Sequence, residues 1–236
     1  MQTSYSAHEI ARFDALAQRW WDPNGPMRPL HRMNPARIGW IHARICERFG
    51  AAPVRVLDVG CGAGVAAEAL ARRGHAVLGL DPAPEAIAAA RRHAEGRDLP
   101  LEYRVGGPEE LAREGARFPV VAALEVIEHV PEPAAFLGTL GGLCEPGGLL
   151  FLSTLNRTAR AFVAAKLGAE YLLRWLPVGT HDWRRFVTPQ ELAAALRESG
   201  LRLADIAGLS FDPLTGGWRI GRDLAVNYLA LAERTA

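Results

Sequence analysis

The stretch from residue 54 to residue 95 alternates short runs of β-branched residues and leucine with alanine-rich runs of helical length. "VRVLDV" at 54–59 and "HAVLGLD" at 75–81 are typical of buried strands, whereas "GVAAEALARR" at 64–73 and "PEAIAAARRHAE" at 84–95 are typical of helices. Strands and helices that alternate at this spacing form βαβ units around a parallel sheet. The sequence therefore predicts an α/β fold with a mostly parallel sheet and helices on both faces.

The rest of the chain extends the predicted sheet to seven strands, of which the first five take the order 3-2-1-4-5. Further strands are predicted at 101–105, 119–126, 147–154, 201–209 and 223–232, with the turn-rich "DPLTGG" between the last two. A helix is predicted from about Glu132 to Cys144. A second helix is predicted after Thr188, which is a suitable N-cap. Pro189 at the first helical position and Glu191 in a capping box favour a helix start there, and Gly200 favours its end.

A glycine-rich loop, "DVGCGAG" from Asp58 to Gly64, joins the first predicted strand to its helix. Gly60, Gly62 and Gly64 allow the backbone to approach a ligand in the crevice where such sheets bind nucleotide-like molecules. The dinucleotide fingerprint would need a glycine at position 65, which is a valine here. Asp81, at the end of the second strand, can accept hydrogen bonds from both ribose hydroxyls. The pattern resembles the S-adenosylmethionine site of class I methyltransferases; the alternative is a glycine-rich turn beside a surface aspartate.

Three polar side chains follow the fourth predicted strand in "LEVIEHVPEP", residues 124–133. Glu125, Glu128 and His129 lie within about one helical turn at the carboxyl end of that strand, which is the edge where open α/β sheets bind ligands. Two carboxylates and an imidazole here are either incidental loop residues or a group that holds a cation or a reactive substrate.

Several longer motifs resemble those of the ubiquinone-biosynthesis O-methyltransferase family. They are "RWWD", "LHRMNPAR", "STLNR", "LEVIEHVPEP" and "DPLTGGWRIGRDLAVNY", and the resemblance extends from about Glu9 to Tyr228. It implies a Rossmann-like class I methyltransferase that methylates the hydroxyls of polyprenylated phenols or catechols, namely 2-polyprenyl-6-hydroxyphenol and 3-demethylubiquinol. Residues 1–50 are then a helical cap over the site, and residues 153–187 an insertion after the fifth strand.

The cofactor site is expected to extend into the cap. Asn34 and Pro35 can start a helix, which puts Arg37 on the first turn, within reach of the cofactor carboxylate. In the resembled family the matching arginine binds the cofactor; the alternative is a solvated arginine. His31 is an unassigned candidate for substrate contact. The expected cofactor-binding residues are Arg37, Asp58, Gly60, Gly62, Gly64, Asp81 and Leu124.

The resemblance also favours a catalytic and metal-binding role for Glu125, Glu128 and His129. A phenol has a pKa of about 10, so a divalent cation that chelates adjacent oxygens would favour the phenolate. Two carboxylates favour magnesium, while the histidine would also accept manganese or zinc. His129 has a second candidate role as a general base.

The insertion at 153–187 is too long for a simple connection. It carries six basic residues and two acidic ones, a net charge of +4 in a chain of net charge +1. Its aromatic and aliphatic residues suit a lipid interface with anionic headgroups. However, these residues fall all around the helical wheel. A contact with an anionic membrane and a lid packed on the protein's own core are therefore equal alternatives. The basic residues are Arg157, Arg160, Lys166, Arg174, Arg184 and Arg185.

Composition sets the remaining limits. The 236 residues, 49% of them apolar, fit a single domain over 1–236, and the net charge of +1 does not favour a nucleic-acid partner. Three cysteines without paired spacing predict free thiols and a cytoplasmic protein. Its expected partners, besides the substrate, are the inner face of a membrane, contacted through the insertion, and a quinone-biosynthesis complex. Two alternatives stay open: a methyltransferase for another small phenol, and a non-catalytic lipid-binding accessory protein.

Overall fold

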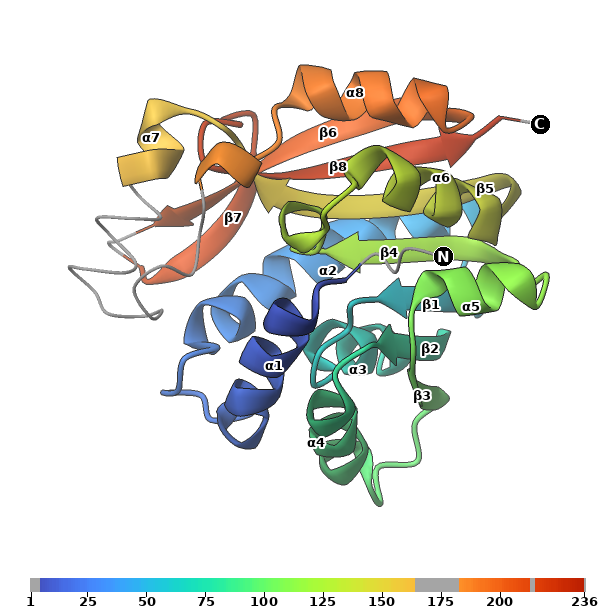
Figure 1. Ribbon diagram of the computed structural model, residues 1–236, viewed down its shortest axis with the longest axis vertical. Coiled ribbons are helices and arrows are strands. Elements are labelled where there is room, and N and C mark those ends of the chain that lie inside the picture. Colours follow the sequence, from blue (N-terminus) through green and yellow to red (C-terminus); the bar gives the residue numbers. More distant parts are fainter. Residues whose placement is uncertain (1–4, 164–182, 213–214, 236) are drawn as a thin grey trace.

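The computed structural model describes residues 5–163, 183–212 and 215–235, which form one mixed eight-stranded sheet with helices on both faces (Figure 1). The sheet order is β3-β2-β1-β4-β5-β8-β6-β7. The strands are β1 (Arg55–Val59), β2 (Ala76–Asp81), β3 (Leu101–Val105), β4 (Phe118–Leu124), β5 (Cys144–Leu155), β6 (Leu201–Asp212), β7 (Gly217–Gly221) and β8 (Asn227–Arg234). The predicted α/β fold and the order 3-2-1-4-5 are confirmed.

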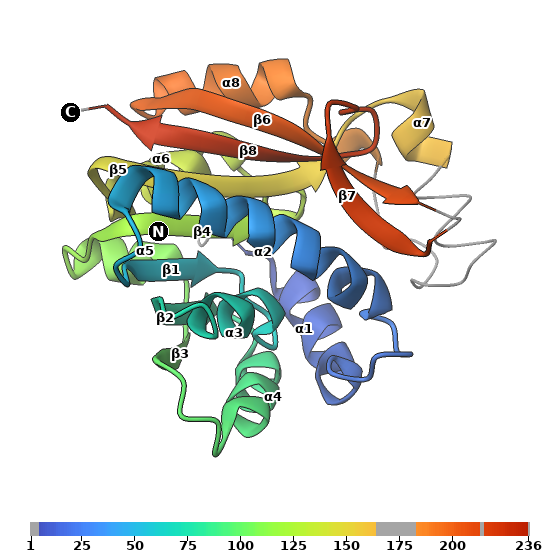
Figure 2. The same ribbon diagram turned by 180° about the vertical axis from the view of Figure 1, so that it is seen from behind.

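Each face of the sheet carries its own apolar core. One core includes side chains of α5 (Pro108–Arg113), α6 (Pro133–Leu143) and α8 (Pro189–Glu198). The other includes those of α2 (Arg28–Phe49), α3 (Val65–Ala71) and α4 (Pro84–Ala94), and Figure 2 shows α2 crossing this face. The strands β1 and β4 are buried between the two cores, which explains their almost unbroken apolar sequences.

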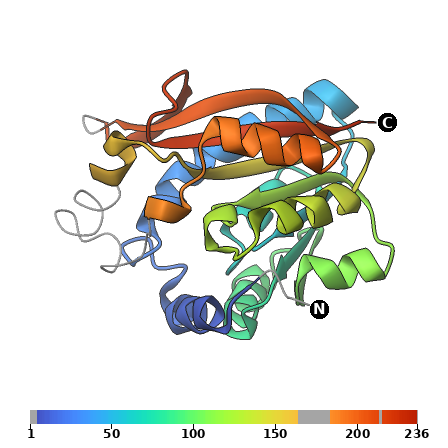
Figure 3. The same ribbon diagram turned by 45° about the horizontal axis from the view of Figure 1, so that its top comes forward.

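The helical segments that precede α2, together with the start of α2, lie at the carboxyl ends of the parallel strands, and we call them the cap. The cap consists of α1 (Ala7–Leu16), a 3₁₀ turn (Ala17–Arg19) and the first part of α2. Figure 3 shows α1 beside α4, which it contacts. One expectation was wrong: α2 begins at Arg28, with Pro29 in its first turn, so Pro35 lies inside the helix and Arg37 in its interior.

The C-terminal strands differ from the prediction. An eighth strand, β7, pairs antiparallel with β6 and was not predicted, because the glycines at 216, 217 and 221 resemble turn residues. The strand expected at 223–232 begins only at Asn227. By contrast, the start of α8 is as predicted, since Thr188 and Glu191 form a capping box. No helix among the described residues is long and apolar enough to cross a membrane.

The insertion after β5 is described only at its two ends. They form α7 (Ala159–Phe162) and a 3₁₀ turn (Trp183–Arg185). Lys166 and Arg174 lie outside the described residues, so the expectations that rest on them are not addressed by the structure. Figures 1 and 2 both place α7 and β7 at the same end of the molecule.

Candidate active site

The glycine loop between β1 and α3 is packed so tightly that side chains would not fit. Gly60, Gly62 and Gly64 have φ angles of 71°, 54° and 86°. A Cβ atom at Gly62 would lie 2.3 Å from the indole of Trp20, and one at Gly60 would lie 2.5 Å from Val126. The loop therefore needs glycine both for its backbone conformation and because the cap and the segment after β4 press against it.

Asp81, at the end of β2, holds this loop by hydrogen bonds to the backbone. Its carboxylate accepts hydrogen bonds from the backbone N–H groups of Gly62, at 2.8 Å, and Ala83, at 2.9 Å. Burial raises the pKa of Asp81 to about 6, although these two hydrogen bonds oppose the shift. Each carboxylate oxygen retains a lone pair for a further donor. The alternative of a surface aspartate does not apply, because Asp81 is buried.

Asp58, at the end of β1, is the least satisfied carboxylate of the site. It is 1% exposed, and its Oδ2 atom has no hydrogen-bond partner among the described residues. Burial raises its pKa to about 7, against the opposing effect of Arg37. A buried acceptor of this kind is costly unless a ligand supplies the missing donor.

Arg37 reaches the same site from α2. Its guanidinium is buried, and its Nε atom donates to Asn34 Oδ1 at 2.9 Å, while Asn34 Nδ2 donates to the carbonyl of Val65 at 2.9 Å. Burial lowers the pKa of Arg37, whereas Glu125 and Asp58 raise it. The alternative of a solvated arginine is therefore wrong, and Asn34 is a positioning residue that the sequence reasoning had assigned only to a helix start.

The chain turns sharply after β4. Leu124 ends the strand, and Glu125 adopts a φ of 57°, which is rare for a residue other than glycine and is often found at functional sites. The N–H of Glu125 donates to the carbonyl of Ser153 at 3.0 Å, and Ser153 Oγ donates to Glu125 Oε1 at 2.7 Å. The neighbouring strand β5 thus holds this glutamate in place.

Glu128 and His129 follow in a 3₁₀ turn (Ile127–His129), and each has a different partner. Glu128 is buried and accepts a hydrogen bond from Thr154 Oγ1 at 3.0 Å; burial and the nearby Glu125 raise its pKa. His129 Nδ1 lies 2.9 Å from Glu9 Oε2 on α1. Burial lowers the pKa of His129, but Glu9 and Glu128 outweigh it and raise the pKa overall.

Glu9 was missed by the sequence reasoning, for a local reason. It stands three residues after Ser6, whose hydroxyl caps α1 by accepting from the N–H of Glu9. That spacing is typical of a capping residue and gives no sign of a contact with residue 129. The ion pair exists only because the cap folds over the end of β4.

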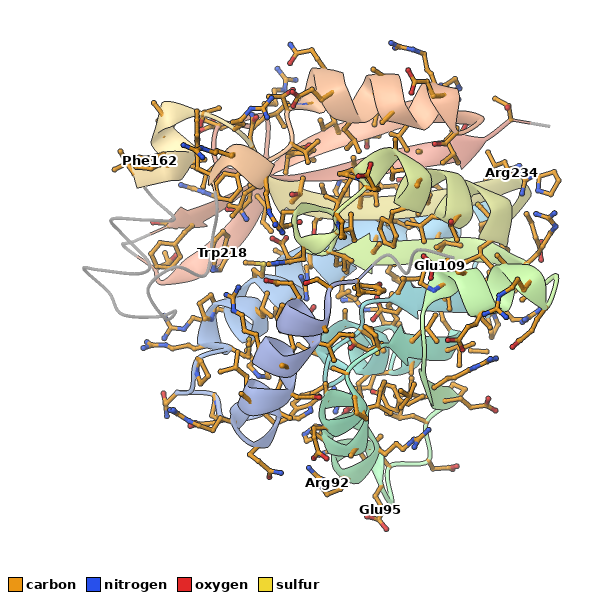
Figure 4. The ribbon with its side chains drawn as sticks, viewed as in Figure 1. Arg92, Glu95, Glu109, Phe162, Trp218 and Arg234 are labelled. Carbon is orange, nitrogen blue, oxygen red and sulfur yellow. The ribbon has the colours of Figure 1, made fainter. Side chains whose placement is uncertain are left out.

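The predicted site residues other than Gly64 line one cavity of about 890 Å³, together with residues of the cap and of the β6–β7 hairpin. Gly64 instead faces Tyr103 behind the loop. Figure 4 labels Trp218, one of the lining residues on β7. The cavity volume lies in the upper part of the roughly 300–1,000 Å³ range of small-molecule sites. His31 does not line the cavity; its Nε2 atom contacts the carbonyl of Trp20 at 2.8 Å.

The expected metal site does not appear in this arrangement of side chains. Among the residues that the structure describes, no group of three or more histidine, cysteine, aspartate or glutamate side chains could hold a metal ion. Glu125, Glu128 and His129 instead engage Ser153, Thr154 and Glu9, respectively.

Comparisons with known proteins identify the family. A sequence model of a methyltransferase domain matches residues 14–206. A ubiquinone biosynthesis O-methyltransferase from a Methylobacterium species is 48% identical over 99% of this chain and 97% of the relative. The protein of the same name from Azorhizobium caulinodans is 46% identical over 95% of this chain and 92% of the relative.

The chain belongs to the ubiquinone biosynthesis O-methyltransferase family.

Solved structures agree with this assignment at the level of the fold. A magnesium protoporphyrin IX methyltransferase from Synechocystis PCC 6803 with bound S-adenosylmethionine has a TM-score of 0.65 and 18% identity, covering 99% of this chain and 100% of the other. This chain thus has the Rossmann-like fold of S-adenosylmethionine-dependent methyltransferases. The family assignment and the methyltransferase-domain match make it an O-methyltransferase.

Proposed function

We propose that this protein transfers the methyl group of S-adenosylmethionine to a phenolic hydroxyl of a polyprenylated phenol or catechol on the route to ubiquinone. The observation that carries the proposal is the single cavity that joins the glycine loop to Glu125, Glu128 and His129. The names of the relatives support the substrate class.

The residues at the glycine-loop end fit the cofactor. Asp81 would accept the ribose hydroxyls, and Arg37 would pair with the cofactor carboxylate. The unsatisfied Oδ2 atom of Asp58 would accept from the cofactor ammonium group. The bound cofactor supplies an electrophilic methyl group on a sulfonium. These three side chains would orient the cofactor in the cavity that Glu125, Glu128 and His129 also line.

His129 is the residue that we assign to proton transfer. Because its Nδ1 atom faces Glu9, the Nε2 atom is the one that can accept a proton from a substrate hydroxyl. Glu9 fixes the ring orientation and stabilises the imidazolium that forms, as a carboxylate does behind a catalytic histidine. Glu125 and Glu128, held by β5, would position the hydroxyl for attack in line with the carbon–sulfur bond.

A divalent cation, most simply magnesium, was expected from the sequence and is the competing account of the same three residues. In the arrangement described, Glu125, Glu128 and His129 do not fit a metal, because each would have to leave its present partner. The steps above therefore use these side chains with the partners that the structure shows.

Turnover after chelation distinguishes His129 acting as a base from a divalent cation acting on the substrate hydroxyl. Chelator-treated protein, shown by elemental analysis to be free of divalent metal, is expected to keep its turnover with a prenylated catechol. In His129→Gln, turnover should fall about a hundredfold or more while the cofactor affinity stays unchanged. Glu132→Gln is the matched control, because Glu132 is exposed in the same loop. Loss of turnover on chelation that magnesium restores would establish the cation instead of the base.

We also propose that the ends of the insertion contact an anionic membrane. Phe162, Val163 and Trp183 are among the few large apolar side chains that are more than a third exposed, and the rings of Phe162 and Trp183 lie 6.2 Å apart. Arg160 and Arg184, which lie within three residues of them in the sequence, are exposed as well. Apolar side chains beside basic ones are suited to the headgroup region of a membrane. A contact with other proteins of quinone biosynthesis stays a prediction from the family resemblance.

Vesicle sedimentation tests this contact. Binding to vesicles that contain anionic lipid should weaken with added salt, and should weaken when Arg157, Arg160, Lys166 and Arg174 are replaced by Gln, by about 1 kcal/mol per residue near the surface. Arg92→Gln is the control, because Arg92 is exposed on α4, away from α7 (Figure 4). If the protein does not bind vesicles, or if neither salt nor these substitutions change the binding, the alternative of a lid packed on the protein's own core is favoured.

A further inference from the structure

The hairpin of β6 and β7 presents a row of apolar side chains to the cavity. Leu209 pairs with Ile220, and Phe211 pairs with Trp218. Directly opposite residues of an antiparallel pair point to the same face, and residues two apart on a strand do so as well. These four side chains therefore share one face, and all four line the cavity. We call them the hairpin ladder.

The start of α2 forms the facing wall. Leu30 and Met33 line the same cavity, and α2 contacts β7 along this side. A Cβ atom at Gly216, before β7, would lie 3.6 Å from the guanidinium of Arg32 on α2. The hairpin and α2 thus supply apolar side chains from two sides of the cavity, although Ser210 and Arg219 of the hairpin line it as well.

The two halves of the hairpin ladder differ in burial, because Leu209 is buried and Ile220 packs against a core, whereas the aromatic pair is more open. Phe211 and Trp218 are only half-buried, with ring centroids 5.6 Å apart. The indole N–H of Trp218 is inaccessible to solvent and has no hydrogen-bond partner within the described part of the chain. Half-exposed aromatic rings that line a cavity are typical of a ligand site, although the buried N–H group of Trp218 is not part of that surface.

This part of the cavity extends to α7, which carries the exposed side chains of Phe162 and Val163; we call these two residues and Trp183 the exposed patch. Arg160 on α7 and Asp223 both line the cavity, and their side chains form an ion pair at 3.1 Å. Phe162, the next aromatic residue on α7, belongs to the exposed patch, and Figure 4 labels it above Trp218. A long apolar ligand that leaves the cavity here would emerge beside apolar side chains.

We propose that the hairpin ladder, together with Leu30 and Met33, binds the first isoprene units of the substrate tail and makes the enzyme select prenylated over unprenylated rings. The inference rests on the proposed function. An isoprenoid chain fits because it is apolar along its length, as are the side chains of the hairpin ladder, Leu30 and Met33. Binding energy gained along the tail would hold the ring hydroxyl against the cofactor methyl group.

The test compares kcat/KM for catechols that carry no tail, a single isoprene unit or a short oligoprenyl tail. In the unmodified enzyme kcat/KM is expected to rise with tail length. Trp218→Ala and Phe211→Ala should reduce that rise by on the order of tenfold, as expected for lost apolar contact. Ile220→Trp, which fills the space, should penalise only the longer tails. Thr215→Ala, exposed in the same hairpin, is the control.

Two further measurements keep the outcome clear. Melting temperature and S-adenosylmethionine affinity should match those of the unmodified protein, which excludes misfolding. With the unprenylated catechol, the ladder variants should turn over at a rate within about twofold of the unmodified enzyme. The inference is overturned if tail length has no effect, or if the rise survives in all three variants. If no phenol of any kind is methylated by the unmodified enzyme, the proposed function itself fails.

Discussion

At the scale of single residues, the site depends on carboxylates whose environments differ. Asp81 is buried but already accepts two backbone hydrogen bonds, whereas Asp58 is buried with one oxygen unsatisfied. Both have raised pKa values because burial disfavours their charged forms. A cationic cofactor that brings hydroxyl and ammonium donors would satisfy both, which leads to two predictions.

Asp81→Ala should weaken S-adenosylmethionine binding by roughly 1.5 to 3 kcal/mol, the usual contribution of hydrogen bonds to a charged group. Titration calorimetry measures the effect, and Glu95→Ala, exposed at the end of α4, is the control. Asp81→Asn retains the side-chain shape but can accept only one of the two backbone hydrogen bonds, so it should also weaken binding. An affinity that does not change in either Asp81 variant would exclude Asp81 from the cofactor site.

Asp58 should make cofactor binding depend on pH. With a pKa of about 7 in the free protein, much of Asp58 is protonated below neutrality, whereas the cofactor ammonium favours the carboxylate. Affinity should therefore rise between about pH 5.5 and pH 7.5, with up to a tenfold gain per unit at the acid end and proton release on binding. Calorimetry in buffers of different ionisation enthalpy measures that release. In Asp58→Asn the release near neutrality should disappear, and its persistence would argue against this role.

At the scale of elements, the cap and the glycine loop form one packing unit. The Trp20 indole occupies the space where a side chain on Gly62 would lie, and Trp21 donates from Nε1 to the carbonyl of Ala63 at 2.9 Å. The ring of Trp21 also stacks on His93 of α4. The cap is thus fixed to the loop that is proposed to hold the cofactor. A substitution that strains the loop should therefore also disturb its packing against the cap.

Gly62→Ala tests this coupling. The substitution places a Cβ atom 2.3 Å from Trp20, at a residue whose φ is 54°. The left-handed backbone conformation alone should lower the unfolding free energy by roughly 1–2 kcal/mol, and the clash with Trp20 should lower it further. Gly96→Ala is the matched control, because Gly96 has a φ of 72° and open space around it. In the Trp20→Ala background the excess penalty should disappear. Equal losses in Gly62→Ala and Gly96→Ala, measured by denaturant unfolding, would show that the cap does not press on the loop.

Elements set by local sequence could be predicted, and those set by distant contacts could not. The capping box of Thr188 and Glu191 is complete within four residues, so α8 was placed correctly. The strand β7 depends on its pairing with β6, since its own glycines resemble a turn. Likewise, Glu125, Glu128 and His129 were placed at one strand end, but their partners Ser153, Thr154 and Glu9 come from β5 and α1. Because these partners are distant in the sequence, the local motif suggested a metal cluster and not the pairings that the fold contains.

At the scale of the whole molecule, the sheet order brings the parts of the site together. The glycine loop follows β1, the Glu125 turn follows the adjacent β4, and the hairpin ladder lies on β6 and β7 at the far edge. The cap spans the distance between them, so that one cavity contacts all three. This continuity lets an electrophilic cofactor, a phenol and an apolar tail bind side by side.

The most direct measurement of the central claim is a transfer experiment with S-adenosylmethionine that carries an isotopically labelled methyl group. Incubated with the protein and a prenylated catechol, the label should appear on a ring oxygen of the product, identified by mass spectrometry and NMR, with release of the demethylated cofactor. His129→Gln, with the cofactor still bound, should form little of this product. Label on a carbon atom, or no transfer to any phenol by a protein that binds the cofactor, would contradict the account.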